Sequence, residues 1–135
     1  MYTREFPAGS EIITVGKKFR EIFFITMGGV NLYTKQDVIF MNLTEGTVFG
    51  DYQVFYGLNS NMTVRTVIDE NVPISKFMGC ERGVVEDLCD LYPKTAENLQ
   101  QRALEKRHVW MHYMRKADLP YSQRSTHSKK KEATD

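Results

Sequence analysis

The sequence has few cysteines, and the two it has form no familiar pattern. Cys80 and Cys89 stand nine positions apart in a chain of 135 residues. Two thiols are too few for the disulfide framework of a small secreted domain. Neither belongs to a Cys-x-x-Cys pair or has a histidine at the spacing of a zinc site. We therefore expect two buried or surface thiols.

Long apolar runs are absent as well. No stretch of about 18 apolar residues occurs, which is the length that crosses a bilayer as a helix. The N-terminus lacks the charged and apolar regions of a secretory signal peptide. We expect a soluble, cytosolic segment with no direct membrane insertion.

An excess of charge of one sign is also lacking. The formal net charge is +1, and residues 115–135 carry six Lys and Arg against three Asp and Glu, so the rest of the chain sums to −2. A nearly neutral body excludes the broad basic face of a nucleic-acid-binding domain.

What is present is a rhythm of short apolar runs from Phe6 to Phe77, with 41% hydrophobic residues overall. Turn signals interrupt these runs every eight to twelve residues, which is typical of an antiparallel barrel or jelly roll. The run Ile22–Ile25 is apolar on both faces and predicts a central strand. The expected strands are Glu11–Val15, Glu21–Met27, Val30–Thr34, Val38–Asn42, Thr63–Ile68 and Ile74–Phe77.

After Gly83 the apolar period becomes helical. One stripe consists of Val84, Val85, Leu88, Leu91 and Tyr92, and Pro93 is expected to stop it. A longer helix is expected to start near Thr95, with an apolar face of Ala96, Leu99, Ala103, Trp110 and Met114. We predict one domain over residues 1–116, with a barrel at 5–79 and helices at 83–116, and a disordered basic tail over 117–135.

The segment Leu43–Val54 has the residue pattern of an anion-binding turn. Gly46 and Gly50 allow a tight turn, and the Phe49-Gly50-Asp51 triplet opens a short helix expected over Tyr52–Tyr56. Closely approaching backbone N–H groups favour an anion, and an acid beside them can hold a hydroxyl.

Taken together, the turn glycines in their order resemble the cyclic nucleotide-binding domain over residues 5–114. The resemblance implies an α+β fold: an antiparallel β-barrel (jelly roll) of about eight strands, a short helix in the phosphate-binding cassette, and two C-terminal helices. The matching positions are Pro7-Ala8-Gly9, Gly16, Phe24-Ile25, Gly28, Val30, Leu43, Gly46, Phe49-Gly50-Asp51, Thr63-Val64-Arg65 and Tyr92-Pro93.

The same resemblance implies where a ligand, cAMP or cGMP, would bind. The implied ligand-binding residues are Phe49, Gly50, Asp51, Tyr52, Gln53, Ser60, Asn61, Met62 and Thr63. In this family the last helix acts as a lid over the base, and the candidate lid residues here are Leu99, Arg102, Ala103 and Lys106, with Arg107 also at the rim. A helix that packs on a barrel without any ligand needs the same apolar stripe, so that alternative stays open.

Two positions depart from the family pattern. Asp51 stands where the family has a glutamate that binds the ribose 2'-hydroxyl, and it is shorter by one C–C bond of about 1.5 Å. It either binds the sugar at closer range or through water, or it serves as an N-cap or first-turn acid of the short helix. Ser60 replaces the arginine that forks onto the cyclic phosphate, and this loss predicts weak or absent binding. Arg65 is a candidate substitute on the neighbouring strand.

The cassette at residues 49–61 and the run Leu104–His108 are similar to voltage-gated cation channel domains, namely the cyclic nucleotide-gated and ether-a-go-go-like potassium channels, protist variety. This implies a regulatory domain at the cytoplasmic face of a membrane, partnered by the rest of the channel polypeptide and neighbouring subunits, whose pocket occupancy and lid position gate the pore. The alternatives are a regulatory domain of a kinase-type receptor and a non-binding assembly module. In the latter, the pocket is empty or filled by the chain itself, for which Leu119-Pro120-Tyr121 is the candidate segment.

No catalytic function is indicated. No pair of nucleophile and base is evident, so we expect no enzyme and no cofactor. His108 and His112 lie one helical turn apart but have no evident third metal ligand, so we expect surface histidines and no metal site.

Overall fold

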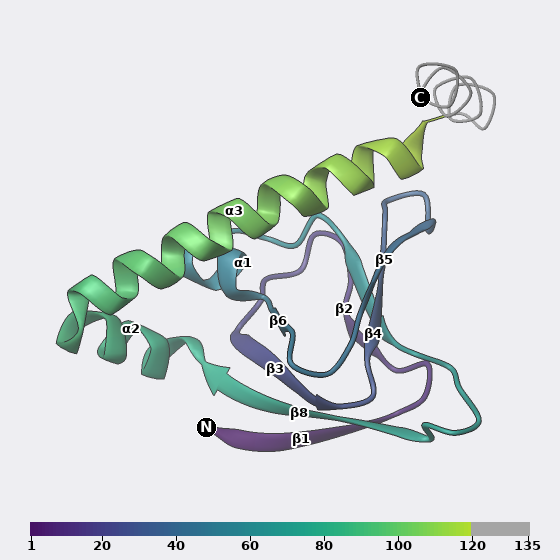
Figure 1. The fold of residues 1–135 in the computed structure, drawn as a ribbon, viewed down its shortest axis with the longest axis horizontal. Coiled ribbons are helices and arrows are strands. Elements are labelled where there is room, and N and C mark those ends of the chain that lie inside the picture. Colours follow the sequence, from purple (N-terminus) through teal and green to yellow (C-terminus); the bar gives the residue numbers. More distant parts are fainter. Residues whose placement is uncertain (120–135) are drawn as a thin grey trace, which may run out of the picture.

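Two antiparallel four-stranded sheets face each other, and a long helix lies across one end of them (Figure 1). The computed structural model describes residues 1–119. The strands are β1 (Tyr2–Pro7), β2 (Glu11–Ile13), β3 (Glu21–Met27), β4 (Val30–Tyr33), β5 (Ile39–Leu43), β6 (Val48–Phe49), β7 (Thr63–Thr66) and β8 (Ile74–Glu81). The helices are α1 (Asp51–Tyr56), α2 (Arg82–Leu91) and α3 (Pro93–Asp118). The predicted fold, antiparallel strands followed by two C-terminal helices, is confirmed.

The strand order is β1-β8-β3-β6 in one sheet and β2-β7-β4-β5 in the other. Strand β3 is central, as its apolar sequence predicts, because it pairs with β8 on one side and β6 on the other. Its inward residues Phe23 and Ile25 are buried, whereas Phe24 is 42% exposed. The outer face of β3 is therefore only partly covered.

Two strands were not predicted from the sequence. Strand β1 alternates half-buried and exposed residues and holds its place at the sheet edge by pairing with β8. Its charged Arg4 and Glu5 give it a weak strand signal. Strand β6 is only two residues long. Strand β8 runs four residues beyond the predicted end at Phe77, because Met78 and Gly79 pair with both β1 and β3, and Cys80 pairs with β3.

The helix boundaries also differ from the predicted ones. Helix α3 begins at Pro93 rather than Thr95, since a proline at the first helical position loses no needed hydrogen bond. It ends at Asp118, so the first two residues of the predicted tail are helical. The rest of that prediction, over 120–135, lies outside the described residues. Of the predicted stripe on α2, only Val85 is buried, while Leu88 and Leu91 are exposed.

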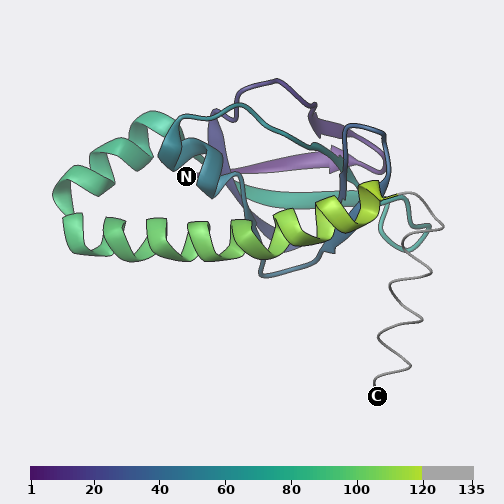
Figure 2. The same ribbon diagram turned by 90° about the horizontal axis from the view of Figure 1, so that it is seen from above.

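The helix α3 shares one hydrophobic core with the sheets. The centre of that core holds Phe23, Phe49 and Phe77, whose ring centroids lie 5.1 to 5.9 Å apart. Trp110, Met111 and Met114 of α3 belong to the same cluster. Seen from above, α3 runs along the barrel from α2 toward its far end (Figure 2). Burial of these side chains anchors the C-terminal half of α3.

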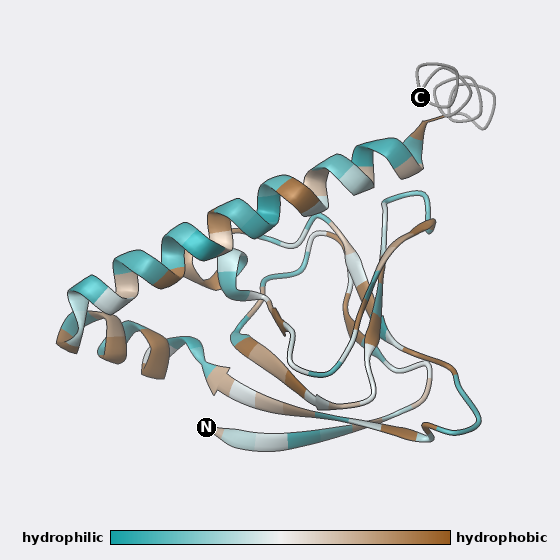
Figure 3. Ribbon diagram, in the orientation of Figure 1, coloured by the Kyte–Doolittle hydropathy of each residue, from teal (hydrophilic) through white to brown (hydrophobic). Residues whose placement is uncertain are grey.

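Most of the α3 ribbon is coloured hydrophilic, whereas the strands and α2 have longer apolar stretches (Figure 3). Leu99, predicted for the apolar face of this helix, is 45% exposed. The N-terminal part of α3 extends past the barrel to meet α2 (Figure 1). Over residues 1–119, no helix has both the length and the apolar character needed to span a membrane.

Candidate functional site

The first structural feature of the site is the buried turn at Gly50. Gly50 lies between β6 and α1 with φ of 84°, a left-handed conformation that glycine adopts without strain. A Cβ there would come within 3.0 Å of the Glu21 carbonyl oxygen and 2.8 Å of the Phe19 ring. Only glycine fits this close approach, and the turn sets the direction in which α1 leaves the barrel.

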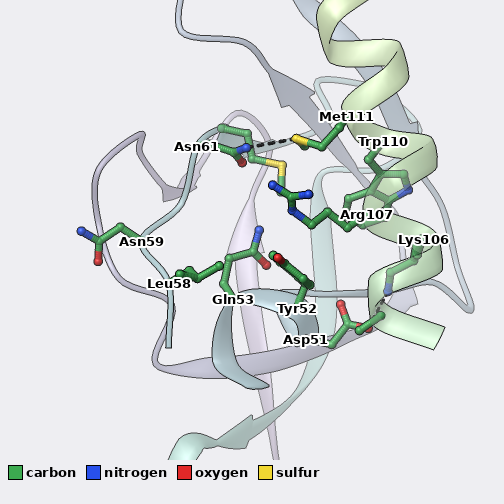
Figure 4. A pocket seen from close by; sticks show the side chains of 12 residues that line it. Asp51, Tyr52, Gln53, Leu58, Asn59, Asn61, Lys106, Arg107, Trp110 and Met111 are labelled. Atoms are coloured by element: carbon green, nitrogen blue, oxygen red, sulfur yellow. Dashed lines mark hydrogen bonds and ion pairs between the residues drawn. The ribbon is translucent and has the colours of Figure 1, made fainter. Parts of the chain in front are cut away.

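A cavity of about 230 Å³ lies where α1, the loop before β7 and α3 meet (Figure 4). The lining is polar on the α1 side and mixed on the α3 side. The lining residues are Asp51, Tyr52 and Gln53 of α1, Leu58, Asn59, Asn61 and Met62 of the loop, and Ala103, Lys106, Arg107, Trp110 and Met111 of α3.

The carboxylate of Asp51 is held by the long helix. The Lys106 Nζ donates to Asp51 Oδ2 at 2.8 Å and to the Val48 carbonyl oxygen at 2.8 Å. The ammonium group also lies 5.1 Å from the centre of the Trp110 ring. Asp51 is a first-turn residue of α1 but not its N-cap, which is Gly50. Its carboxylate thus joins α1 to α3.

The Ser60 side chain forms its hydrogen bonds within its own turn. The side chain is buried, and its hydroxyl donates to the Met62 carbonyl oxygen at 2.6 Å and accepts from the Met62 N–H at 3.3 Å. The backbone of Ser60 pairs with Gly16 and Lys17. Ser60 is uncharged and does not line the cavity, so this position offers no cation to a phosphate.

Arg65 does not substitute for the missing arginine. Its guanidinium pairs with Asp37 at 2.8 Å and with Glu11 at 3.4 Å, and it lies over the Tyr33 ring. The hydrogen bond to Asp37 raises the pKa of Arg65 further above its ordinary value. These partners hold Arg65 on the outside of β7, away from the cavity lining.

The cavity brings together eight of the fourteen residues predicted for the site and its lid. These are Asp51, Tyr52, Gln53, Asn61, Met62, Ala103, Lys106 and Arg107. The Asn61 side chain faces α3, where its amide lies 3.1 Å from the Met111 sulfur.

The other six lie elsewhere. Phe49 is in the core, Gly50 lies in the turn, Ser60 is closed onto Met62, and the Thr63 hydroxyl accepts from the Val15 N–H. Arg102 is exposed. Leu99 faces a separate apolar hollow of about 330 Å³ beside α2, which Cys80 and Cys89 also line. Both cysteines are free, half-buried thiols, and burial raises the pKa of Cys89.

Leu58, Asn59, Trp110 and Met111 were not predicted as site residues. The positions 103, 106, 107, 110 and 111 follow the three- and four-residue spacing of one helix face, so this signal was present in the sequence. It marks the face of α3 that packs, without indicating which part of that face lies over the cavity and which over the core.

Comparisons with known proteins bear on the family and on the fold. The family model described as cyclic nucleotide-binding domain matches residues 3–72. A search of the curated proteins found no match. Among solved structures, cAMP-bound PfPKA-R superposes with a TM-score of 0.67 at 15% identity, over 90% of this chain and 38% of that one.

Two further structures are similar. A putative cyclic nucleotide-binding protein from Geobacter metallireducens has a TM-score of 0.62 at 13% identity, covering 80% of this chain and 76% of that one. The regulatory subunit of a cAMP-independent protein kinase A from Trypanosoma brucei has a TM-score of 0.56 at 17% identity, covering 63% and 30%. The chain thus spans about a third of the length of each of these two kinase regulatory chains. At these identities the likenesses show the fold alone.

Proposed function

Because the chain belongs to the cyclic nucleotide-binding domain family, we propose that it is a regulatory module whose cavity takes a cyclic nucleotide weakly and whose helix α3 transmits the occupancy. The observation that carries this proposal is the Lys106–Asp51 contact. In the family, the acid at this position binds the ribose hydroxyl. Here the same carboxylate already binds the Lys106 ammonium of the lid, so a ligand hydroxyl and Lys106 compete for one group.

The cavity volume agrees with low affinity. Small-molecule sites usually measure about 300–1,000 Å³, and this cavity has about 230 Å³. A nucleotide therefore requires the side chains of α3 to shift outward. When the Asp51–Lys106 pair breaks, the sugar hydroxyl is the only hydrogen-bond partner left for a largely buried carboxylate. This lowers the net free energy gained on nucleotide binding.

Calorimetric titration with cAMP and cGMP up to millimolar concentration tests the proposal. Asp51→Ala should abolish the binding signal. Lys106→Met should tighten binding by about tenfold, or about 1.4 kcal/mol, since couplings between contacting charged groups are of this size. Arg102→Met, an exposed position on the same helix, is the matched control and should leave the affinity unchanged. A weaker affinity in Lys106→Met would contradict competition for Asp51.

For the parent protein we propose a cation channel, on the resemblance of residues 49–61 and 104–108 to channel-borne domains. The module would then act at the cytoplasmic face of a membrane, without enzymatic activity, and α3 would pass its movement to the gate. The alternative is a kinase-type regulator, which two of the similar structures represent. Inhibition of a protein kinase A catalytic subunit by this domain, relieved by cAMP, would favour the kinase context over the channel.

A second candidate function is a packing module that binds no nucleotide. It is favoured by the closed turn at Ser60 and by the occupation of Asp51 by Lys106. The candidate plug Leu119-Pro120-Tyr121 lies outside the described residues apart from Leu119. If neither nucleotide gives heat with the wild type or with Lys106→Met, this second function replaces the first.

A further inference from the structure

The cavity wall formed by α1 and its following loop contains no basic residue. This wall consists of Asp51, Tyr52, Gln53 and the loop residues from Leu58 to Met62 that face the cavity. Ser60 turns away into its own hydrogen bonds, and Arg65 is paired elsewhere. A phosphate group in this cavity would meet no positively charged side chain from this wall.

Both basic side chains that line the cavity come from α3. Lys106 is engaged by Asp51 and by the Val48 carbonyl. Arg107 has a different position: its guanidinium lies over the Tyr52 ring, 4.7 Å from the ring centre. Figure 4 shows the Arg107 side chain reaching from α3 into the cavity. Within residues 1–119, no carboxylate lies at ion-pair distance from this guanidinium.

A guanidinium that lies over an aromatic ring keeps N–H donors available. The ring attracts the cation through its face, and the five N–H donors lie in the guanidinium's own plane. This arrangement suits bidentate hydrogen bonds to two oxygens of a phosphate. Tyr52 is half-buried in the first turn of α1, so its contact with Arg107 keeps the guanidinium on the α1 side of the cavity.

We propose that Arg107 of α3 supplies the phosphate-binding charge of this cavity, in place of a cation from the barrel. The proposal rests on the proposed nucleotide-binding function. The ligand class is a phosphate ester with a neighbouring hydroxyl, the phosphate facing Arg107 and the hydroxyl facing Asp51. Because the charge is carried by the lid, phosphate affinity exists only while α3 is packed against α1. The phosphate thereby stabilises the packed lid directly.

The test compares a charged and an uncharged ligand on matched variants. The dissociation constants of cAMP and adenosine are measured by calorimetry for the wild type, Arg107→Gln, Arg107→Lys and Arg102→Gln. Arg107→Gln should weaken cAMP binding about tenfold or more and leave adenosine unchanged. Arg107→Lys keeps the positive charge but not the bidentate guanidinium, so its affinity for cAMP should lie between those of the wild type and Arg107→Gln. Arg102→Gln makes the same charge change on an exposed part of α3 and should match the wild type.

Several outcomes would overturn the proposal. Equal weakening of cAMP and adenosine in Arg107→Gln would show a contact with the base or sugar instead. Unchanged cAMP affinity in Arg107→Gln, with binding retained by the wild type, would reject Arg107 alone and leave the proposed function standing. Absence of binding by the wild type and all variants would reject both. The Trp110 fluorescence unfolding midpoint of each variant verifies that it is folded.

Discussion

At the scale of single residues, Gly50 and Gly46 share a left-handed backbone but differ in their surroundings. Their φ angles are 84° and 88°. A Cβ at Gly46 meets no atom within 4 Å, whereas at Gly50 it meets backbone and a buried ring. The comparison therefore separates backbone strain from steric conflict.

Gly46→Ala should lower the free energy of unfolding by about 1–2 kcal/mol, the cost of a left-handed residue. Gly50→Ala should cost a further 1–3 kcal/mol or so, because neither the Glu21 carbonyl nor the core can yield without repacking. Urea denaturation of the two variants measures the difference. Equal losses would show that the turn tolerates a side chain.

Ser60 is the second residue whose role depends on its contacts. Ser60→Ala removes both hydrogen bonds to Met62 and should destabilise the domain by about 1–2 kcal/mol without altering cAMP affinity. Ser60→Arg loses the same bonds but adds the family's phosphate ligand, so it should bind cAMP at least about tenfold more tightly. Urea denaturation and calorimetry on both variants provide the two readouts. An Arg variant that is destabilised yet binds no better would exclude the phosphate position at residue 60.

At the scale of elements, the contact between α1 and α3 depends on one ion pair and on close packing. Ala103 is fully buried on the face of α3 that lines the cavity, and Lys106 is one turn further along. The side chains of Lys106 and Asp51 are 26% and 13% exposed, so solvent screens their attraction only in part.

A double-mutant cycle with Lys106→Met and Asp51→Asn should give a coupling free energy of about 1–2 kcal/mol by urea denaturation. Arg82 and Glu86, an exposed pair spaced four residues apart on α2, form the control cycle, for which we expect about 0.5 kcal/mol or less. If the two cycles give the same coupling, the contact does not hold the lid more firmly than a surface pair.

At the scale of the whole molecule, α3 and the barrel share one core, which predicts a single unfolding transition. Trp110 is the only tryptophan of the chain and is buried in α3 against that core. Its fluorescence reports on α3, whereas far-ultraviolet circular dichroism also reports on the sheets. The two denaturation curves should therefore coincide.

The control for this prediction is Trp110→Phe with a tryptophan placed at Phe23 in β3. Phe23 is buried in the centre of the barrel, so the new fluorophore reports on the sheets alone. The midpoint of its fluorescence denaturation curve should agree with the midpoint of the circular dichroism curve recorded on the same double variant. An earlier transition at Trp110 in the natural chain would mean that α3 detaches while the barrel stays folded.

Local patterns in the sequence determined much of this fold. Turn glycines at Gly16, Gly28, Gly46 and Gly50 all adopt positive φ, as their places between apolar runs indicate. The doubly apolar run of β3 predicted its central place, and the change of period after Gly83 predicted two helices. Such features depend on neighbours in the chain, so they can be read without the tertiary structure.

The rest was decided by tertiary contacts. Strand β1 forms because β8, from 67 to 77 positions away along the chain, offers it a pairing partner. Lys106 and Asp51 are separated by 55 positions, and their pairing depends on where α3 crosses α1. The sequence left Asp51 with two roles, sugar contact or helix acid, and packing supplied a third, since a flexible lysine binds whichever carboxylate the helix crossing brings within reach.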